Sequence, residues 1–182
     1  RAYGGGPNAS AFFQKAGVPV VDIGWTPDIP AVMENTRRIA DELGEPARGA
    51  AVNAEMQARL DRLQRRAQTR TALYMTPAGV TTGPGSLIHE MIETAGLTNM
   101  QTDAGWRSLP LETLAYETPD VVAAAVFGAR TNHPDAWSPM KHPVARDQLT
   151  KSEVVSLEGA WTSCSGWFLM DAVEALAEGM TE

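Results

Sequence analysis

Residues 71–96, TALYMTPAGVTTGPGSLIHEMIETAG, contain in order the signals of a strand, a loop and a helix. The first five residues are apolar or β-branched and predict a strand, whereas residues 76–85 are rich in Gly, Thr and Pro and predict a loop. Ser86 is a suitable N-cap for the helix, and Gly96 is placed to end it. Because this order is the repeating unit of α/β proteins, the stretch assigns the chain to that class.

The same alternation continues to the end of the chain. Residues 120–127 are apolar after the first position, which is typical of a central parallel strand that is covered on both faces. Further strands are predicted at residues 99–102 and 153–157, and helices at residues 111–116, 138–149 and 168–177. We therefore expect an open, mostly parallel α/β lobe over residues 70–182.

The sequence before this lobe is organised differently. Residues 46–68 carry an apolar stripe at helical spacing and predict a helix long enough to cross a whole lobe. The arginines around the stripe, among them Arg59, are expected to form a solvated face. Residues 1–28 contain one helix and a β-branched strand at residues 18–23, without the neighbours that a parallel sheet requires. Either a part of the protein further upstream or a partner chain must supply those neighbours.

The composition excludes several classes of protein. The 182 residues include 15 Lys and Arg against 22 Asp and Glu, and the net charge of −7 argues against a nucleic-acid binder and against docking on anionic lipid. A single cysteine, Cys164, excludes an intramolecular disulfide and a thiolate metal cage. No apolar run approaches the roughly 18 residues of a membrane-spanning helix. Because the chain begins at Arg1 and not at Met, we expect it to be processed or cut, so a missing leader says nothing about export.

Patterns for catalysis are missing from the sequence. It has no Gly-x-Ser-x-Gly elbow, no histidine pair at metal-binding spacing and no convincing acid–base pair, so we predict no catalytic residue, metal site or cofactor. Instead, aromatic and cationic residues lie just past the predicted strands: Trp25, Trp106, Arg107, Arg130, Trp137 and Trp161. Strand ends of an open α/β sheet form one rim, so these residues together predict a binding cleft. Each tryptophan taken alone is also consistent with filling its own lobe, and the loop at residues 79–86 with a plain structural turn.

A series of motifs resembles a known family. The chain is similar to ABC-transporter substrate-binding proteins for ferric siderophores and cobalamin, whose fold is two α/β lobes joined by a long helix, with the ligand held between the lobes. The opening of their second lobe resembles residues 73–99, followed by Gly105-Trp106, Leu111-Glu112-x-Leu114 and Pro119-Asp120-Val121-Val122. Residues 161–177 resemble the closing helix, and residues 16–21 and 34–39 resemble the end of the first lobe and the linking region.

The resemblance implies a division of the chain and a site. Residues 1–28 would be a remnant of the first lobe, residues 29–69 a linking region with the connecting helix at about 46–68, and residues 70–182 the second lobe. Trp106 occupies the place of an aromatic that often lines the cleft, and Arg107 beside it suits an acidic group of the ligand. Second-lobe ligand contacts are implied for Thr81, Thr82 and Trp161, and contact with basic residues of the permease for Glu112. A first-turn carboxylate such as Glu112 also stabilises a helix N-terminus, and Pro110 stands where the family usually has Ser.

The implied function is capture of a ferric siderophore in the periplasm and its delivery to an ABC permease, without bond making. Cobalamin or haem binding within the same family is the first alternative. A metal-complex-processing enzyme on a similar fold is the second, and it would need a ligand such as His133 in the cleft. A non-binding interaction module is the third. Because the strand at residues 18–23 would lack a partner, we also expect a homo-oligomer formed through the N-terminal remnant.

Overall fold

A four-stranded parallel sheet forms the centre of the molecule. The computed structural model describes residues 9–21, 23–63, 69–126 and 139–179. The sheet has the order β3-β1-β5-β6, with β1 at Thr71–Met75, β3 at Thr98–Asn99, β5 at Val121–Val126 and β6 at Glu153–Glu158. All three strand pairings are parallel, which confirms the predicted parallel α/β lobe.

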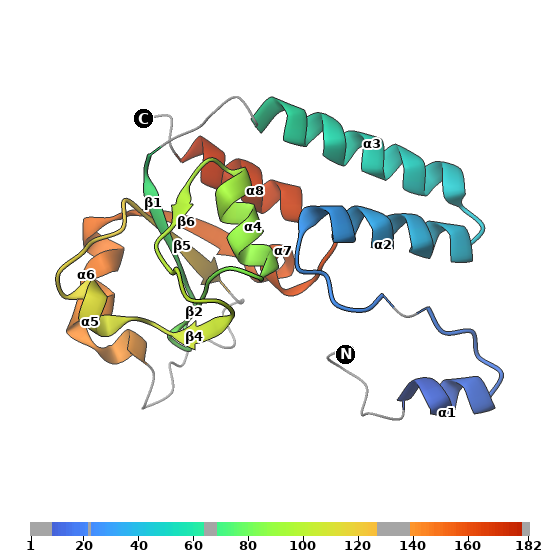
Figure 1. Cartoon of the computed structure of the whole chain (residues 1–182), viewed down its shortest axis with the longest axis horizontal. Coiled ribbons are helices and arrows are strands. Elements are labelled where there is room, and N and C mark those ends of the chain that lie inside the picture. Colours follow the sequence, from blue (N-terminus) through green and yellow to red (C-terminus); the bar gives the residue numbers. More distant parts are fainter. Residues whose placement is uncertain (1–8, 22, 64–68, 127–138, 180–182) are drawn as a thin grey trace.

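Helices cover both faces of this sheet (Figure 1). Side chains alternate along a strand, so neighbouring residues of β1 enter different cores. Tyr74 packs into the larger core with α4 (Leu87–Thr94) and α8 (Leu169–Glu178), whereas Leu73 packs into the smaller core with α5 (Leu111–Leu114) and α6 (Pro143–Lys151). The almost unbroken apolar character of β1 and β5 follows from this double coverage.

The predicted helix signals of the opening stretch are confirmed at both ends of α4. The hydroxyl of Ser86 accepts a hydrogen bond of 3.2 Å from the backbone N–H of His89, as an N-cap does. Gly96 follows the helix with a φ of 89°, a left-handed conformation that glycine adopts without a steric cost. The loop predicted over residues 76–85 is wrong in part, because Val80–Thr82 forms a short strand, β2.

A second, two-stranded sheet contains this unpredicted strand. β2 pairs antiparallel with β4 (Trp106–Ser108), which the sequence also gave no sign of. The pairing joins residues more than twenty positions apart, so no local pattern reveals it. The two strands form a ribbon beyond the carboxyl end of β1 (Figure 1).

Predictions for the second half of the lobe are confirmed in outline and corrected in detail. The predicted strand at residues 99–102 is the two-residue β3, and the predicted helix at residues 138–149 is a 3-10 turn at Pro139–Lys141 followed by α6. Pro143 therefore begins α6 and does not interrupt a helix, since proline is well suited to the first helical turn. A short helix, α7 (Gly159–Ser163), follows β6 and was not predicted.

Two antiparallel helices pack over the lobe (Figure 1). They are α2 (Ile29–Glu42) and α3 (Pro46–Leu63), of which α2 contacts α4 and α3 contacts α8. The predicted apolar stripe is confirmed on α3, where Met56 and Leu63 are buried in the larger core and Leu60 packs against it. The last five residues of the predicted connecting helix, 64–68, lie outside the described residues.

The prediction of a solvated arginine face on this helix is wrong for Arg59. Its guanidinium donates to Glu174 Oε1 at 2.8 Å, to Glu174 Oε2 at 2.6 Å and to Asp171 Oδ1 at 2.6 Å, and only 11% of its side chain is exposed. These bonds raise the pKa of Arg59 and lower that of Glu174. The pair of carboxylates on α8 therefore fastens α3 to the lobe.

The segment before α2 departs most from the prediction. The helix α1 (Ala9–Lys15) is confirmed. Gly17, whose φ is 69°, follows shortly after its last residue. Residues 18–21 and 23 form no strand, because no neighbouring strand within the described part of the chain offers them hydrogen bonds. The segment is attached at its end, where Asn35 Nδ2 donates to the carbonyl of Ile23 at 2.7 Å. Across the described residues, no helix is both long and apolar enough to cross a membrane.

Acid is expected to weaken the junction between α3 and α8. A carboxylate whose pKa is lowered by folding stabilises the fold above its unfolded-state pKa, and this contribution disappears as the pH falls through the folded-state value. For Glu174 the loss therefore begins below about pH 4.5. Urea denaturation between about pH 7 and about pH 3 should show a falling free energy of unfolding, with a smaller fall in the variant Glu174→Gln. Equal falls in the two proteins would contradict this assignment.

Candidate functional site

The ribbon of β2 and β4 brings together four of the predicted site residues. Its register places Thr81 opposite Arg107 and Thr82 opposite Trp106. The ribbon follows the carboxyl end of β1, the end at which open α/β sheets bind their ligands. Residues directly opposite each other in an antiparallel pair share a face. The ribbon therefore has an aromatic face with Trp106 and a cationic face with Arg107.

Trp106 is held by one aromatic contact and leaves about half of its surface exposed. Its indole meets the ring of Tyr74 edge to face, with ring centroids 6.1 Å apart and an interplanar angle of 73°. Trp106 is nevertheless 51% exposed, whereas Tyr74 is buried in the larger core. An indole that is fixed in place but half exposed can contact a ligand without losing much conformational entropy on binding.

Tyr74 also connects this ring to the end of β6. Burial raises the pKa of Tyr74, and a side-chain hydrogen bond with Thr162 acts in the opposite direction. Thr162 lies in α7 beside Trp161, which is partly buried against the larger core. Thr162, the neighbour of the predicted residue Trp161, is therefore linked to Trp106 through Tyr74, and Trp161 itself packs against the larger core.

Arg107 lies on the other face of the ribbon with its guanidinium half exposed. Its Nε is 3.7 Å from Asp103 Oδ2, and exposed pairs of this kind contribute little free energy. The guanidinium is therefore available to an anionic group. Thr81 opposite it is fully buried, and its hydroxyl has no hydrogen-bond partner. Because neighbouring residues of a strand point to opposite faces, Arg107 and Trp106 cannot both lie flat against one side of a ligand.

A buried polar network, missed by sequence reasoning, holds the ribbon in place. Asn99 Nδ2 donates to the carbonyl of Thr82 at 3.0 Å, and Gln101 Oε1 accepts from the backbone N–H of Asp103 at 2.9 Å. The backbone N–H of Gly83 donates to the carbonyl of Gly105 at 3.1 Å. A Cβ atom at Gly83 would collide with the carbonyl oxygen of Asp103, so only glycine fits there. The signal in the sequence was the run of Asn, Gln and Asp at every second position from residue 99.

The remaining predicted residues do not join the ribbon. Trp25 is exposed and follows a segment that forms no strand, so the reason for placing it on the rim is wrong. Glu112 is exposed in the first turn of α5, whose Leu111 and Leu114 pack into the smaller core. Pro110 caps that helix without a side-chain hydrogen bond. Arg130, together with His133 and Trp137, lies outside the described residues.

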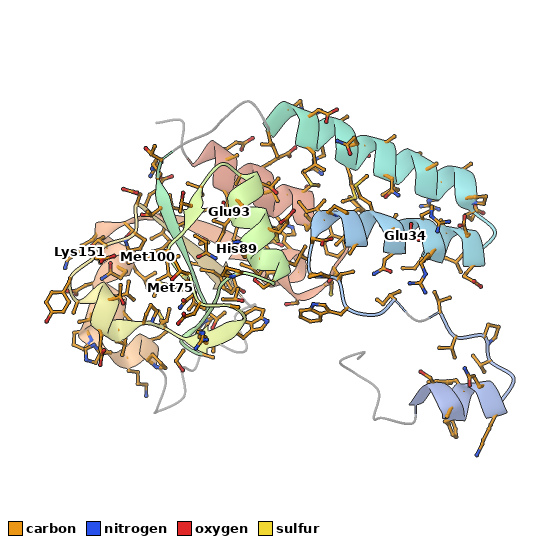
Figure 2. The ribbon with its side chains drawn as sticks, in the orientation of Figure 1. Glu34, Met75, His89, Glu93, Met100 and Lys151 are labelled. Carbon is orange, nitrogen blue, oxygen red and sulfur yellow. The ribbon has the colours of Figure 1, made fainter. Side chains whose placement is uncertain are left out.

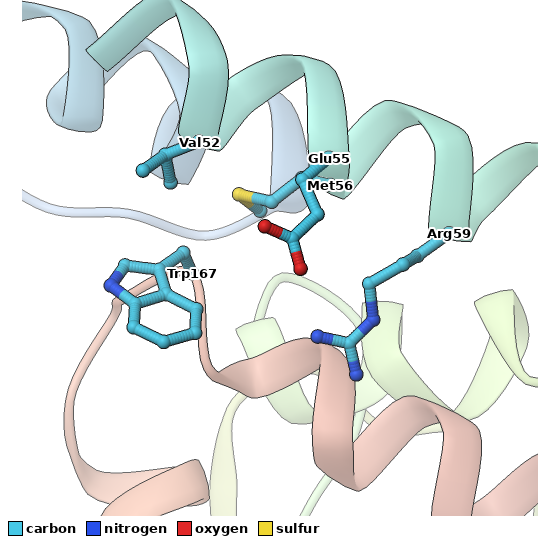
Figure 3. A pocket seen from close by; sticks show the side chains of 5 residues that line it. All are labelled: Val52, Glu55, Met56, Arg59 and Trp167. Atoms are coloured by element: carbon cyan, nitrogen blue, oxygen red, sulfur yellow. The ribbon is translucent and has the colours of Figure 1, made fainter. Parts of the chain in front are cut away.

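A small pocket occurs elsewhere, between α3 and the start of α8 (Figure 3). It holds about 70 Å³ and is lined by Val52, Glu55, Met56, Arg59 and Trp167. Its volume is well below the several hundred cubic ångströms of a typical ligand pocket. The described part of the chain contains no cluster of three or more His, Cys, Asp or Glu side chains that could hold a metal ion.

The fold agrees with what sequence and structure comparisons find. The family model for periplasmic binding proteins matches residues 8–135. The chain therefore belongs to the periplasmic binding protein family. No curated protein sequence matches the chain significantly.

Solved structures share the fold along almost the whole chain. The periplasmic heme-binding protein RhuT from Roseiflexus sp. RS-1 in its apo form has a TM-score of 0.76 at 21% identity, covering 96% of this chain and 73% of its own. The periplasmic heme-binding protein BhuT in complex with two hemes has a TM-score of 0.72 at 25% identity, with 96% and 72% covered. The ABC-type Fe3+-hydroxamate transport protein of Saccharomonospora viridis DSM 43017 has a TM-score of 0.71 at 17% identity, with 93% and 64% covered.

Proposed function

We propose that this chain is the solute-binding component of an ABC importer and that it captures an iron complex, with a ferric siderophore as the main candidate. The observation that carries the proposal is the half-exposed indole of Trp106, fixed against Tyr74 at the carboxyl end of the sheet. Binding proteins hold ligands of this size by aromatic contact and a few polar groups. Membership of the periplasmic binding protein family supports the same function.

Haem is the second candidate, and two observations favour it. A half-exposed indole offers an aromatic surface for a planar macrocycle. BhuT, which is 25% identical to the chain, was solved with two hemes. We expect Trp106 to stack on either kind of ligand, while the fully buried Thr81 and Thr82 support the ribbon beneath it. Arg107 would contact only a ligand that extends past the edge of the ribbon to its cationic face. Trp161 remains a proposed ligand contact.

Delivery of the ligand would involve Glu112 in α5, which begins shortly after β4 of the ribbon. The exposed carboxylate of Glu112 is suited to pair with a basic residue of the permease, and such a pair steers docking more than it adds affinity. We place this function in the periplasm, with no chemical conversion of the ligand. Arg130 and the exposed Trp25 remain proposed ligand contacts.

The apolar N-terminal segment is expected to make the chain associate with itself. The exposed large apolar residues of this segment are Phe12, Phe13, Val18, Val20, Val21 and Ile23. Together they form a longer apolar stretch than a monomer usually exposes. Light scattering across micromolar concentrations should show a rising mass, and replacing Phe12 and Phe13 by Ser should lower it. A constant monomer mass in both proteins would contradict the expectation.

A fluorescence titration tests the proposed function. Tryptophan emission is followed while the chain is titrated with a ferric hydroxamate siderophore, its iron-free form, hemin and cobalamin. We expect a saturable change with the ferric siderophore or with hemin, and a much weaker response to the iron-free siderophore. If none of the four compounds gives a saturable change, the proposed function is wrong.

A further inference from the structure

Asn99 is the residue through which the ribbon is anchored to the rest of the lobe. It is 4% exposed and its side-chain amide touches three different parts of the chain. Its Nδ2 lies 3.0 Å from the carbonyl oxygen of Thr82 and 3.1 Å from Nδ1 of His89. Its Oδ1 lies 3.0 Å from the backbone nitrogen of Gln101. Figure 2 labels His89 on α4, on the side of the helix toward the strands.

These contacts fix the orientation of the amide and, with it, the state of the histidine. A carbonyl such as that of Thr82 can only accept, and the backbone N–H of Gln101 can only donate. The amide therefore cannot be turned round, and both hydrogens of its Nδ2 are directed outward. One goes to Thr82, and the other goes to His89. Nδ1 of His89 must then accept, so the ring is neutral and carries its proton on Nε2.

We propose that Asn99 and the neutral ring of His89 are positioning residues for Trp106, and that protonation of His89 weakens ligand binding. This inference rests on the proposed function. A protonated ring would present an N–H to the N–H of Asn99, so the amide would have to leave one of its partners. Thr82, which pairs with Trp106, would lose the hydrogen bond that its carbonyl accepts from Asn99 and keep the one that its hydroxyl donates to Gly105. Loss of the hydrogen bond between Asn99 and Thr82 would therefore act on the indole of Trp106 indirectly, through Thr82.

The surroundings of His89 allow the protonated ring to form. His89 is partly exposed, so water reaches it. Glu93 lies one turn further along α4 on the same side, and its Oε1 accepts from the backbone N–H of Asn99 at 3.0 Å. Glu93 therefore joins the same network through the backbone of Asn99.

The other charged groups near α4 are already paired or point elsewhere. Glu90 is the neighbour of His89 in the first turn of α4 and lies on a different side of the helix. On α8, which packs against α4, Asp171 and Glu174 are bound by Arg59. On α2, which also contacts α4, Glu34 and Asp41 are bound by Arg37. Among these groups, Glu93 is the one that shares the network of Asn99 and His89.

The test compares the full chain with the variant His89→Gln at two pH values. A glutamine can accept from Asn99 through its amide oxygen but does not titrate. We expect the affinity of the wild-type chain for a ferric hydroxamate siderophore to fall by about tenfold between about pH 7.5 and about pH 5, the cost of one lost hydrogen bond. The His89→Gln variant should change by less than about twofold over the same range. Both proteins meet the same ligand, so its own titration cancels.

A second measurement needs no ligand and so separates this inference from the proposed function. Nitrogen-15 spectra of the imidazole ring should show Nε2 protonated at neutral pH. The indole N–H resonance of Trp106 should move with pH in step with the protonation of His89 in the wild-type chain and stay in place in His89→Gln. An indole resonance that does not follow His89, or that moves equally in the variant, overturns the inference whether or not any iron complex binds. Failure of all the ligands together with the expected NMR result overturns only the proposed function.

Discussion

Replacing Trp106 by alanine is expected to weaken binding of the iron complex by about 30-fold or more. Large aromatic side chains that are fixed before binding contribute about 2 kcal/mol or more when they lie at the centre of a contact. Trp106 meets both conditions, because its ring contacts Tyr74 while half of its surface stays open. The dissociation constant is measured by fluorescence titration with the ferric hydroxamate siderophore and with hemin.

Trp167→Ala is the matched control for this experiment. Trp167 is 49% exposed, almost the same as Trp106, and its ring also meets a neighbouring aromatic, Phe168, edge to face. It lines the small pocket between α3 and α8 and not the ribbon (Figure 3). Its loss should change the affinity by less than about twofold. If Trp167→Ala weakened binding more than Trp106→Ala, the ligand would lie near the pocket between α3 and α8, which would contradict a site on the ribbon.

Replacing Arg59 by methionine is expected to lower the free energy of unfolding by about 3 kcal/mol. The variant keeps the apolar stem but leaves Asp171 and Glu174 with only the exposed guanidinium of Arg62, which lies 3.6 Å from Glu174. Removing one partner of a mostly buried ion pair typically costs about 3 to 5 kcal/mol, and the partial exposure of the two carboxylates favours the lower end. Urea denaturation gives the value.

Arg62 provides the comparison for Arg59. It reaches the same Glu174, but at 3.6 Å and with 66% of its side chain exposed. Exposed pairs of this kind contribute about 0 to 1 kcal/mol, so Arg62→Met should change the free energy of unfolding by less than about 0.5 kcal/mol. If the two substitutions lowered the free energy of unfolding by similar amounts, burial would not explain the contribution of Arg59 to stability.

Elements with complete local signals could be predicted from the sequence. Ser86 and Gly96 mark the ends of α4 by side-chain capping and by a left-handed φ, both of which depend on a few neighbouring residues. The apolar run of β5 predicts a strand buried on both faces without any knowledge of its partners. The parallel order of the sheet follows from the alternation of such elements.

Features that depend on distant partners could not be predicted in this way. The strand predicted at residues 18–23 has suitable residues but no strand to pair with among the described residues. β2 and β4 have unremarkable residues but pair with each other. Arg59 looks solvated on its own helix, and its carboxylate partners lie 112 and 115 residues further along the chain.

The candidate site shows the same division. Trp106 was predicted because aromatic residues past a strand indicate a rim, whereas Thr81 and Thr82 were implied by the family resemblance. That Arg107 points to the other face of the ribbon follows only from its pairing with Thr81 in β2. The role of Asn99 was hidden for the same reason, since its partners come from β2, from α4 and from its own loop.

The most direct measurement uses the iron of the ligand itself. High-spin ferric iron broadens the NMR signals of nearby nuclei, so adding substoichiometric ferric hydroxamate siderophore to the nitrogen-15-labelled chain maps where the ligand lies. We predict early broadening of the Trp106 indole signal and of the backbone amide signals of Thr81, Thr82 and Arg107. The signal of the Trp167 indole should not broaden. A gallium analogue of the siderophore, which is diamagnetic, should broaden none of these signals. Broadening centred on Trp167, or spread evenly over the surface, would contradict the claim that the ribbon of β2 and β4 binds the iron complex.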